Sequence, residues 1–167
     1  HVGSVQLQWA LSASRLSARR LLVRGNPVRR QIFEGSPVRA MRRWGLELDR
    51  FTVLVMGGSQ GALSLNRLVR SALQDHVVQS QKMQVLHLTG AGKLQSAGSF
   101  EKPDGLIYRT EDYVADIQDA YALADLVVCR AGGSTIAELL ALGLPSVLVP
   151  YPHASDDHQQ ANAAVME

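Results

Sequence analysis

The sequence lacks several features that would each define a class of protein. It contains one cysteine in 167 residues, which excludes an internal disulfide framework. That residue, Cys129, follows the apolar run 126–128, and we expect a buried core thiol there. Aromatic residues make up only 5%, too few to alternate with basic residues and stack on bases, so nucleic acid is not an expected partner. The longest apolar stretch, 139–150, is broken by Gly143 and Pro145 and is shorter than the roughly 20 residues that span a bilayer.

The composition that remains is that of a globular domain, with 46% hydrophobic and 19% charged residues. The length suits one domain with a core of its own. The net charge of +2 is unevenly distributed, because residues 1–50 hold ten arginines and three acidic residues. This basic segment is either a solvated face or a surface that lies near phosphates or an anionic membrane. Because the chain begins at His1 and ends at Glu167 inside an apparent helix, we expect it to be a fragment.

From residue 50 onward, short β-branched runs alternate with amphipathic stretches, which is typical of repeated βα units around a parallel sheet. The runs are almost continuously apolar, as in strands that helices cover on both faces. We therefore predict an α/β fold, a Rossmann-like parallel sheet with helices on both faces. The predicted strands are 52–56, 84–88, 106–108, 126–129 and 146–149. The predicted helices are 38–44, 62–77, 114–124, 135–142 and one that starts after Asp157.

A first glycine-rich turn follows the first strong strand. Residues 57–62 read Gly-Gly-Ser-Gln-Gly-Ala and stand where that strand ends and a helix begins. Glycines let the backbone turn sharply and approach a ligand, and the N–H groups of the first helical turn carry partial positive charge. We expect a phosphate here, with the Ser59 hydroxyl as a further donor. The alternative is a tight connection that binds nothing.

A second glycine-rich turn, residues 130–135, follows the strand at 126–129 and reads Arg-Ala-Gly-Gly-Ser-Thr. Ligands of open parallel sheets bind outside the carboxyl ends of the strands, so both turns can face one crevice. Glu138 lies about one helical turn after Ser134 and can accept hydrogen bonds from vicinal ribose hydroxyls. Alternatively, Glu138 is a capping-box partner that reaches back to the helix start.

The spacing of the glycines argues against two common nucleotide sites. A dinucleotide fingerprint requires G-x-G-x-x-G and an acidic residue near the end of the next strand. Residues 57–61 read G-G-x-x-G, and the next strand ends at Leu88 without a carboxylate. A Walker A loop requires Gly-Lys-Ser/Thr, but Leu94 follows Gly92 and Lys93. NAD and an oxidoreductase activity are therefore disfavoured, and a P-loop is absent.

Further polar residues gather after the last strand and in an early turn. Gln159 and Gln160, at a predicted helix start, carry amides that both donate and accept and can read sugar hydroxyls, although solvated loop residues are the alternative. His153, His158 and the neighbouring aspartates have no standard metal-ligand spacing, so no metal is expected. Arg29, in the turn 25–29, has a planar donor fork that suits a nucleobase carbonyl or a phosphate.

Four of these segments together resemble the MurG family of N-acetylglucosaminyltransferases, part of glycosyltransferase family 28, which complete lipid II in peptidoglycan synthesis. The segments are 25–29, 57–62, 129–138 and 158–163. The resemblance implies one half of a GT-B architecture, in which two Rossmann-like domains face a cleft and the C-terminal one holds UDP-N-acetylglucosamine without a cofactor. Residues 25–167 would be that domain, truncated at its C-terminus. Residues 1–24 would be a remnant of the segment between the domains.

Carried over by motif, the resemblance assigns a part of the donor to each candidate residue. Arg29 would lie near the nucleotide, Ser59 would contact the diphosphate, and the backbone of Val114, starting a helix, would meet uracil. The phosphate and ribose would be held by Gly133, Ser134, Thr135 and Glu138. The N-acetylglucosamine would be read by Gln159 and Gln160.

The resemblance also implies what this chain does not carry. The general base and the acceptor surface would lie in an N-terminal domain that has no counterpart here, so no catalytic residue is expected. The parent enzyme would move N-acetylglucosamine to the C4 hydroxyl of lipid I with inversion, as a cytoplasmic protein peripheral to the plasma membrane. The open alternatives are a non-catalytic nucleotide-sugar-binding module or subunit and a related GT-B transferase with another acceptor.

Overall fold

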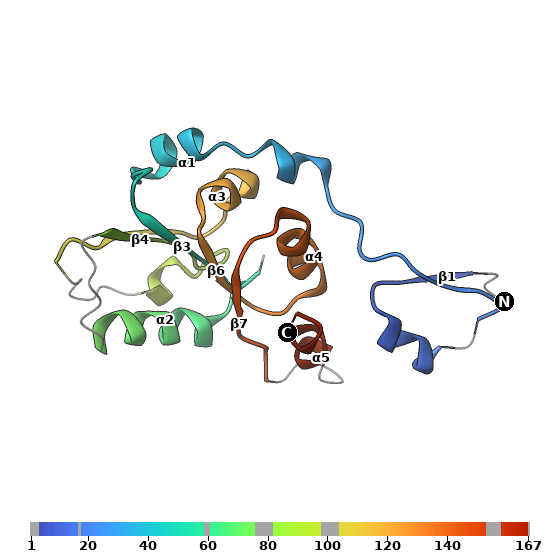
Figure 1. Ribbon diagram of the computed structural model, residues 1–167. Coiled ribbons are helices and arrows are strands. Elements are labelled where there is room, and N and C mark those ends of the chain that lie inside the picture. The colour runs from blue at the N-terminus through green and yellow to red at the C-terminus, as the bar shows by residue number, and fades with distance from the viewer. Residues whose placement is uncertain are drawn as a thin grey trace.

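The computed structural model describes most of the chain and places it in one layered body with a smaller N-terminal sheet beside it (Figure 1). The described residues are 4–16, 18–58, 61–75, 82–97, 104–152 and 158–166. In this part of the chain no helix is both long enough and apolar enough to cross a membrane.

The main sheet has five parallel strands, which confirms the predicted α/β class. The strands are β3 (Phe51–Met56), β4 (Met83–Leu88), β5 (Ile107–Glu111), β6 (Leu126–Cys129) and β7 (Ser146–Leu148). Their order is β5-β4-β3-β6-β7, so the chain builds outward from β3 in one direction and then in the other. Four predicted strands agree with these bounds to within one residue. The fifth, β5, runs to Glu111, three residues beyond the prediction, because it pairs with β4 along that length.

The helices lie on both faces of the sheet. They are α1 (Pro37–Trp44), α2 (Leu63–Asp75), α3 (Ile117–Leu123), α4 (Gly133–Leu142) and α5 (His158–Ala164), with short 3₁₀ turns η1 (Ala10–Arg15), η2 (Arg30–Glu34) and η4 (Leu94–Ala97). Helix α1 starts as predicted, because the Ser36 hydroxyl accepts a hydrogen bond from the Arg39 N–H at 3.3 Å. It ends at Gly45, whose φ of 60° is left-handed.

The prediction that a helix begins at Val114 is wrong. Helix α3 begins at Ile117, after Asp116 as its N-cap. Val114 lies in the connection that follows β5, and its side chain is buried in the core on the α3 side of the sheet. The apolar side chain therefore serves packing before the helix begins.

Two hydrophobic clusters hold the layers together. Leu54 and Met56 of β3 face the cluster formed with α1, α3 and α4, which includes Tyr121 and Leu139. Val55 faces the opposite cluster, which α2 covers. Both sides of the central strand are thus buried, which explains its unbroken apolar run. Cys129 is fully buried, as expected, and burial raises the pKa of its thiol to about 12.

Three polar side chains form a buried network on the α2 side of the sheet. Asn66 donates its amide N–H to the Thr89 carbonyl at 3.0 Å, so its Oδ1 is the atom that faces Nε2 of His87 at 3.0 Å. Nε2 therefore carries the proton, and Nδ1 accepts from the Tyr108 hydroxyl at 2.6 Å. Burial lowers the pKa of His87 to about 4, so the imidazole is neutral at pH 7.

Tyr108→Phe is expected to lower the free energy of unfolding by about 1–2 kcal/mol, because it leaves Nδ1 of the buried His87 without a donor. Urea denaturation of both proteins measures this difference. An unchanged midpoint would mean that the hydroxyl contributes no net stability.

A buried carboxylate ties the segment before α1 to helix α3. Asp119 accepts from the Ser36 N–H at 2.8 Å and from the Arg39 guanidinium at 2.7 and 3.0 Å. Burial alone would raise the pKa of Asp119, but these hydrogen bonds hold it below its usual value. These hydrogen bonds anchor the chain that follows η2 to helix α3. They thereby help to position Arg29, the residue directly before η2.

The N-terminal sheet pairs two short parallel strands, β1 (Val5–Leu7) and β2 (Leu21–Val23). Directly after β1, two side chains form hydrogen bonds with the main body. Gln8 donates to the Gly133 carbonyl at 3.0 Å, and the Trp9 indole N–H donates to Oδ1 of Asn162 at 3.0 Å. Both contacts reach the helices that carry candidate site residues.

Candidate functional site

The two glycine-rich turns lie side by side at the carboxyl edge of the sheet. Met56, the last residue of β3, pairs with Cys129, the last residue of β6. The turns that follow these strands therefore leave the sheet at the same level. Strand order reverses between β3 and β6, and in open parallel sheets this is where a ligand crevice forms.

The first turn needs its glycines for space as well as for conformation. Gly58 and Gly61 have φ of 85° and 66°, and the Gly61 N–H donates to the Gly58 carbonyl at 2.9 Å. A Cβ on Gly57 would collide with Ala62, and one on Gly61 would collide with the Thr89 carbonyl. The candidate diphosphate contact Ser59 lies outside the described residues.

The second turn opens helix α4. Gly132 is the N-cap, and its carbonyl accepts from the Ile136 N–H at 3.0 Å. Gly133, Ser134 and Thr135 thus form the first helical turn, whose N–H groups have no carbonyl partner within the helix. Ser134 is exposed and Gly133 and Thr135 are half-buried, so this turn is accessible to an anion.

The carboxylate of Glu138 brings together residues that are far apart in the sequence. Its Oε1 lies 3.4 Å from Nη2 of Arg29, and its Oε2 accepts from the Tyr121 hydroxyl at 3.0 Å. Two candidate site residues, Arg29 and Glu138, therefore meet directly. Both oxygens of Glu138 have partners on other elements, so the side chain is not the capping-box partner that was the alternative.

Helix α5 reaches the same region through its amide side chains. Oε1 of Gln159 accepts from the Tyr151 N–H at 2.9 Å, and Gln160 is exposed. Asn162 donates to the carbonyl of Ala131, in the second glycine turn, at 3.1 Å. This bond places α5 beside the start of α4.

Positive charge gathers around the crevice. The buried Arg130 guanidinium donates to the carbonyls of Val149 and Pro150 and, at 2.6 Å, to the hydroxyl of Ser64 in the first turn of α2. None of the ion pairs formed by the described residues includes Arg130. Nζ of Lys93 lies 3.4 Å from the Gly61 carbonyl. Both cations stand beside helix starts, which strengthens the attraction for an anion.

Sequence reasoning assigned no contact to three of these residues. Tyr121 and Asn162 act across gaps of 17 and 31 residues, for which no spacing rule exists. Arg130 was recognised as part of the second turn, but its contacts with Ser64 and the end of β7 depend on the folded sheet. The backbone contact expected of Val114 stays a prediction.

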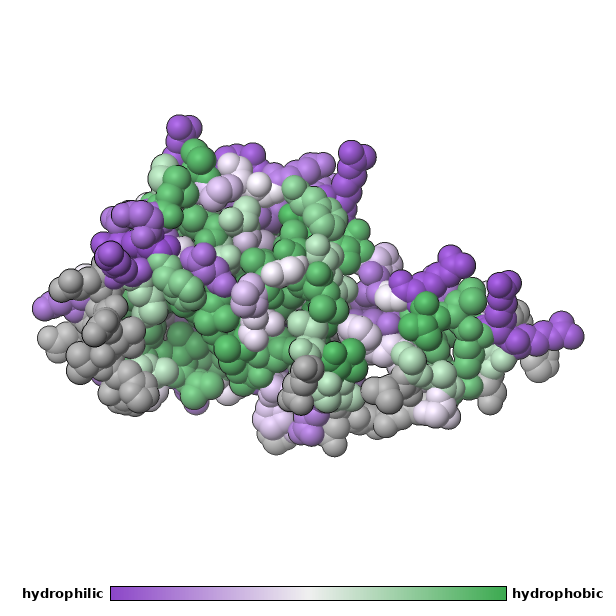
Figure 2. Space-filling view, in the orientation of Figure 1, coloured by the Kyte–Doolittle hydropathy of each residue, from purple (hydrophilic) through white to green (hydrophobic). Residues whose placement is uncertain are grey.

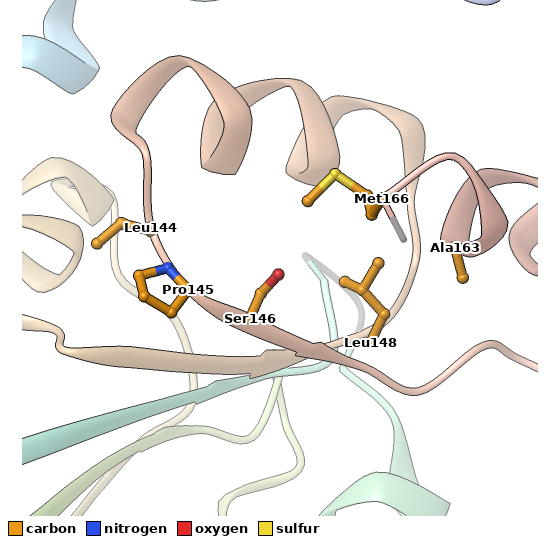
Figure 3. A pocket seen from close by; sticks show the side chains of 6 residues that line it. All are labelled: Leu144, Pro145, Ser146, Leu148, Ala163 and Met166. Atoms are coloured by element: carbon orange, nitrogen blue, oxygen red, sulfur yellow. The ribbon is translucent and has the colours of Figure 1, made fainter.

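A hollow lies between β7 and the end of the chain at α5. It has a volume of about 440 Å³ and is lined by Leu144, Pro145, Ser146, Leu148, Ala163 and Met166 (Figure 3). None of its described lining residues is titratable, and it runs along β7, an edge strand of the sheet. Figure 2 shows hydrophobic residues gathered on this face and hydrophilic ones along the edge that carries α1.

The described residues include no candidate metal site. No group of three or more His, Cys, Asp or Glu side chains lies close enough together there. His153, Asp156 and Asp157, three of the residues considered for a metal, lie outside the described residues. The donors at the crevice are instead helix N–H groups, hydroxyls, amides and two cations, with one carboxylate, which suits an anionic ligand that carries hydroxyls.

Comparison with known proteins gives one consistent result. The model of the glycosyltransferase family 28 C-terminal domain matches residues 52–167. A UDP-N-acetylglucosamine–N-acetylmuramyl-(pentapeptide) pyrophosphoryl-undecaprenol N-acetylglucosamine transferase of Syntrophus aciditrophicus is 36% identical over 99% of this chain and 44% of its own length. Its counterpart from Neisseria meningitidis serogroup C is 47% identical over 85% of this chain and 39% of its own length.

A solved structure agrees with these relatives. The crystal structure of Acinetobacter baumannii MurG superposes with a TM-score of 0.70 and 26% identity, covering 96% of this chain and 49% of that one. The predicted fold, one half of a GT-B glycosyltransferase, is therefore confirmed. The chain spans about two fifths of the length of the curated relatives it matches.

Proposed function

The chain belongs to the glycosyltransferase family 28 C-terminal domain family, and we propose that it supplies the donor-binding half of an N-acetylglucosaminyltransferase. The donor is UDP-N-acetylglucosamine, named in the two curated relatives. We assign the donor-binding domain to residues 25–167 and the connection to the acceptor half to residues 1–24. The observation that carries the proposal is the meeting of Arg29 and Glu138 beside the second glycine turn.

Each part of the donor has a matching group in the crevice. The diphosphate suits the starts of α2 and α4, together with Ser59, Ser134 and Thr135, because these supply N–H and O–H donors. Glu138 suits the ribose hydroxyls, which can only approach a carboxylate as donors. Arg29 and the backbone of Val114 are assigned to the nucleotide, and Gln159 and Gln160 to the hydroxyls of N-acetylglucosamine.

The reaction that this half would support is sugar transfer to lipid I. The C4 hydroxyl of the acceptor attacks the anomeric carbon with inversion, and UDP leaves with growing negative charge on its diphosphate. Preorganised donors at the two helix starts stabilise that charge. The general base and acceptor surface belong to the other half, and the basic residues 1–50 suit a position at an anionic, cytoplasmic membrane face.

Titration calorimetry of this chain with UDP and with NAD tests the proposal. We expect UDP to bind and NAD not to bind, with no sugar transfer by the chain alone. Binding of NAD but not UDP would refute the proposal. Turnover by this chain alone would refute the assignment of the general base to the other half.

Glu138→Ala is expected to weaken UDP binding about tenfold or more, because each hydrogen bond to a charged group contributes about 1.5–3 kcal/mol. Calorimetry gives the two dissociation constants. Glu47→Ala is the matched control, since Glu47 is an exposed acid that precedes β3 at the opposite edge of the sheet. An equal loss in both variants would show that the change in charge, not the site, is responsible.

A further inference from the structure

The Glu138 carboxylate is held by two partners of different character. Tyr121, on α3, is 1% exposed and donates its hydroxyl to Oε2 at 3.0 Å. Arg29, before η2, lies 3.4 Å from Oε1, and its side chain is 60% exposed. The first contact is the shorter one and is partly buried, whereas the second is longer and open to solvent.

The Tyr121 hydroxyl is a permanent donor. Burial first, and then the neighbouring Glu138 carboxylate, raise the pKa of Tyr121 far above its usual value. A buried tyrosine hydroxyl requires a partner, and the partner found here is Oε2. The ring itself packs in the core beneath α3 and α4, with Leu139 in the same cluster, so the hydroxyl has a fixed position.

The contact between Arg29 and Oε1 is weak enough for a ligand to compete with it. An exposed ion pair at this distance contributes little, because solvent screens it and both side chains are long. Oε1 can therefore accept a hydrogen bond from an incoming hydroxyl while Tyr121 keeps Oε2 in place. A carboxylate oxygen has two lone pairs, so Arg29 need not leave.

A fixed carboxylate matters because glutamate is flexible. A free glutamate side chain loses up to about 2 kcal/mol of rotamer freedom when it is immobilised, and a site that orders it beforehand avoids that cost on binding. Glu138 lies one helical turn after the first turn of α4, so an ordered carboxylate there is presented beside the anion-binding N–H groups.

We propose that Tyr121 is a positioning residue: its hydroxyl fixes Oε2 of Glu138, so that Oε1 is oriented for the vicinal hydroxyls of a ribose whose phosphates lie at the start of α4. The inference rests on the proposed function and extends it to a residue that touches no ligand. Tyr121 then acts on affinity only through Glu138 and only for ligands with ribose hydroxyls.

Calorimetry with UDP and with 2′,3′-dideoxyuridine diphosphate tests the inference. Tyr121→Phe keeps the ring in the core, and we expect it to weaken UDP about fivefold to tenfold while leaving the dideoxy nucleotide unchanged. In a Glu138→Ala background the same substitution is expected to have no further effect on either nucleotide. Tyr108→Phe is the matched control, because it removes another buried hydroxyl far from the carboxylate, and it should change neither affinity.

Several outcomes would overturn the inference. Equal losses for the two nucleotides, or a Tyr121→Phe effect that persists in Glu138→Ala, would show a general structural role. Absence of UDP binding by the unmodified chain would refute the proposed function itself, and the ribose role of Tyr121 with it. A measurement without ligand is also decisive: the NMR order parameter of the Glu138 side chain should fall in Tyr121→Phe and not in Tyr108→Phe, and an unchanged value would contradict the inference.

Discussion

Gly61→Ala is expected to lower the free energy of unfolding by about 3 kcal/mol. A left-handed φ costs a non-glycine residue about 1 kcal/mol or more, and Gly61 has φ of 66°. The added methyl would also collide with the backbone of Thr89 and Gly90, and overpacking of this kind costs about 1–3 kcal/mol. Denaturant unfolding monitored by circular dichroism measures the sum.

Gly58→Ala separates the two causes. Gly58 has φ of 85°, but nothing lies within 4 Å of the position its Cβ would take. We therefore expect only the conformational cost of about 1 kcal/mol at this position. Equal losses for the two variants would mean that the close approach of the first turn to Thr89 contributes nothing.

Acidification from pH 7.5 to pH 4 is expected to cost about 3 kcal/mol through His87 alone. The folded pKa of His87 is about 4, whereas an unfolded histidine has a pKa of about 6.5. Between these values the unfolded chain binds more protons than the folded one, so stability falls as pH falls. Urea denaturation measured at half-unit intervals of pH gives the slope of the free energy of unfolding against pH.

His87→Gln is the control for this pH dependence. Glutamine does not titrate, so the slope between about pH 4.5 and 6.5 should largely disappear, whatever the absolute stability of the variant. Asp119 does not confound this window. Its pKa is depressed in the folded state, so its contribution is present above the unfolded carboxyl pKa and is lost only at lower pH. A variant that kept the full slope would contradict the assignment to His87.

The strands and the meeting of the glycine turns could be predicted from the sequence because both depend on local pattern. Residues 126–129 were identified to the residue, since the apolar run ends at Arg130 and the glycines follow. The adjacency of the turns follows from the parallel sheet, whose strands end at one edge. Helix α1 was equally clear because Ser36, Pro37 and Gly45 mark its two ends.

The start of α3 and the contacts of Glu138 depend on tertiary packing, which the spacing of residues in the sequence does not reveal. Asp116 is a favoured N-cap residue type, and the helix does begin after it, although its side chain makes no cap hydrogen bond. The sequence pattern favours Val114 as the helix start, whereas its apolar side chain belongs to the core. Tyr121 reads as one more core aromatic of α3, and only the packing of α3 against α4 turns its hydroxyl toward Glu138. The contact of Arg29 with Glu138 spans 109 residues, and the hydrogen bond from Ser36 to Asp119, near Arg29 in the chain, spans 83.

The pairing of Met56 with Cys129 also has a consequence for engineering. Adjacent strands in a sheet lie about 4.8 Å apart, a spacing set by backbone hydrogen bonds and not by side chains. The separation between Met56 and Cys129, from which the two glycine-rich turns leave the sheet, is therefore independent of the residues inside the turns. Exposed positions that the turns do not need for their own geometry, such as Ser134, can therefore be changed while the span between the anchor points stays constant.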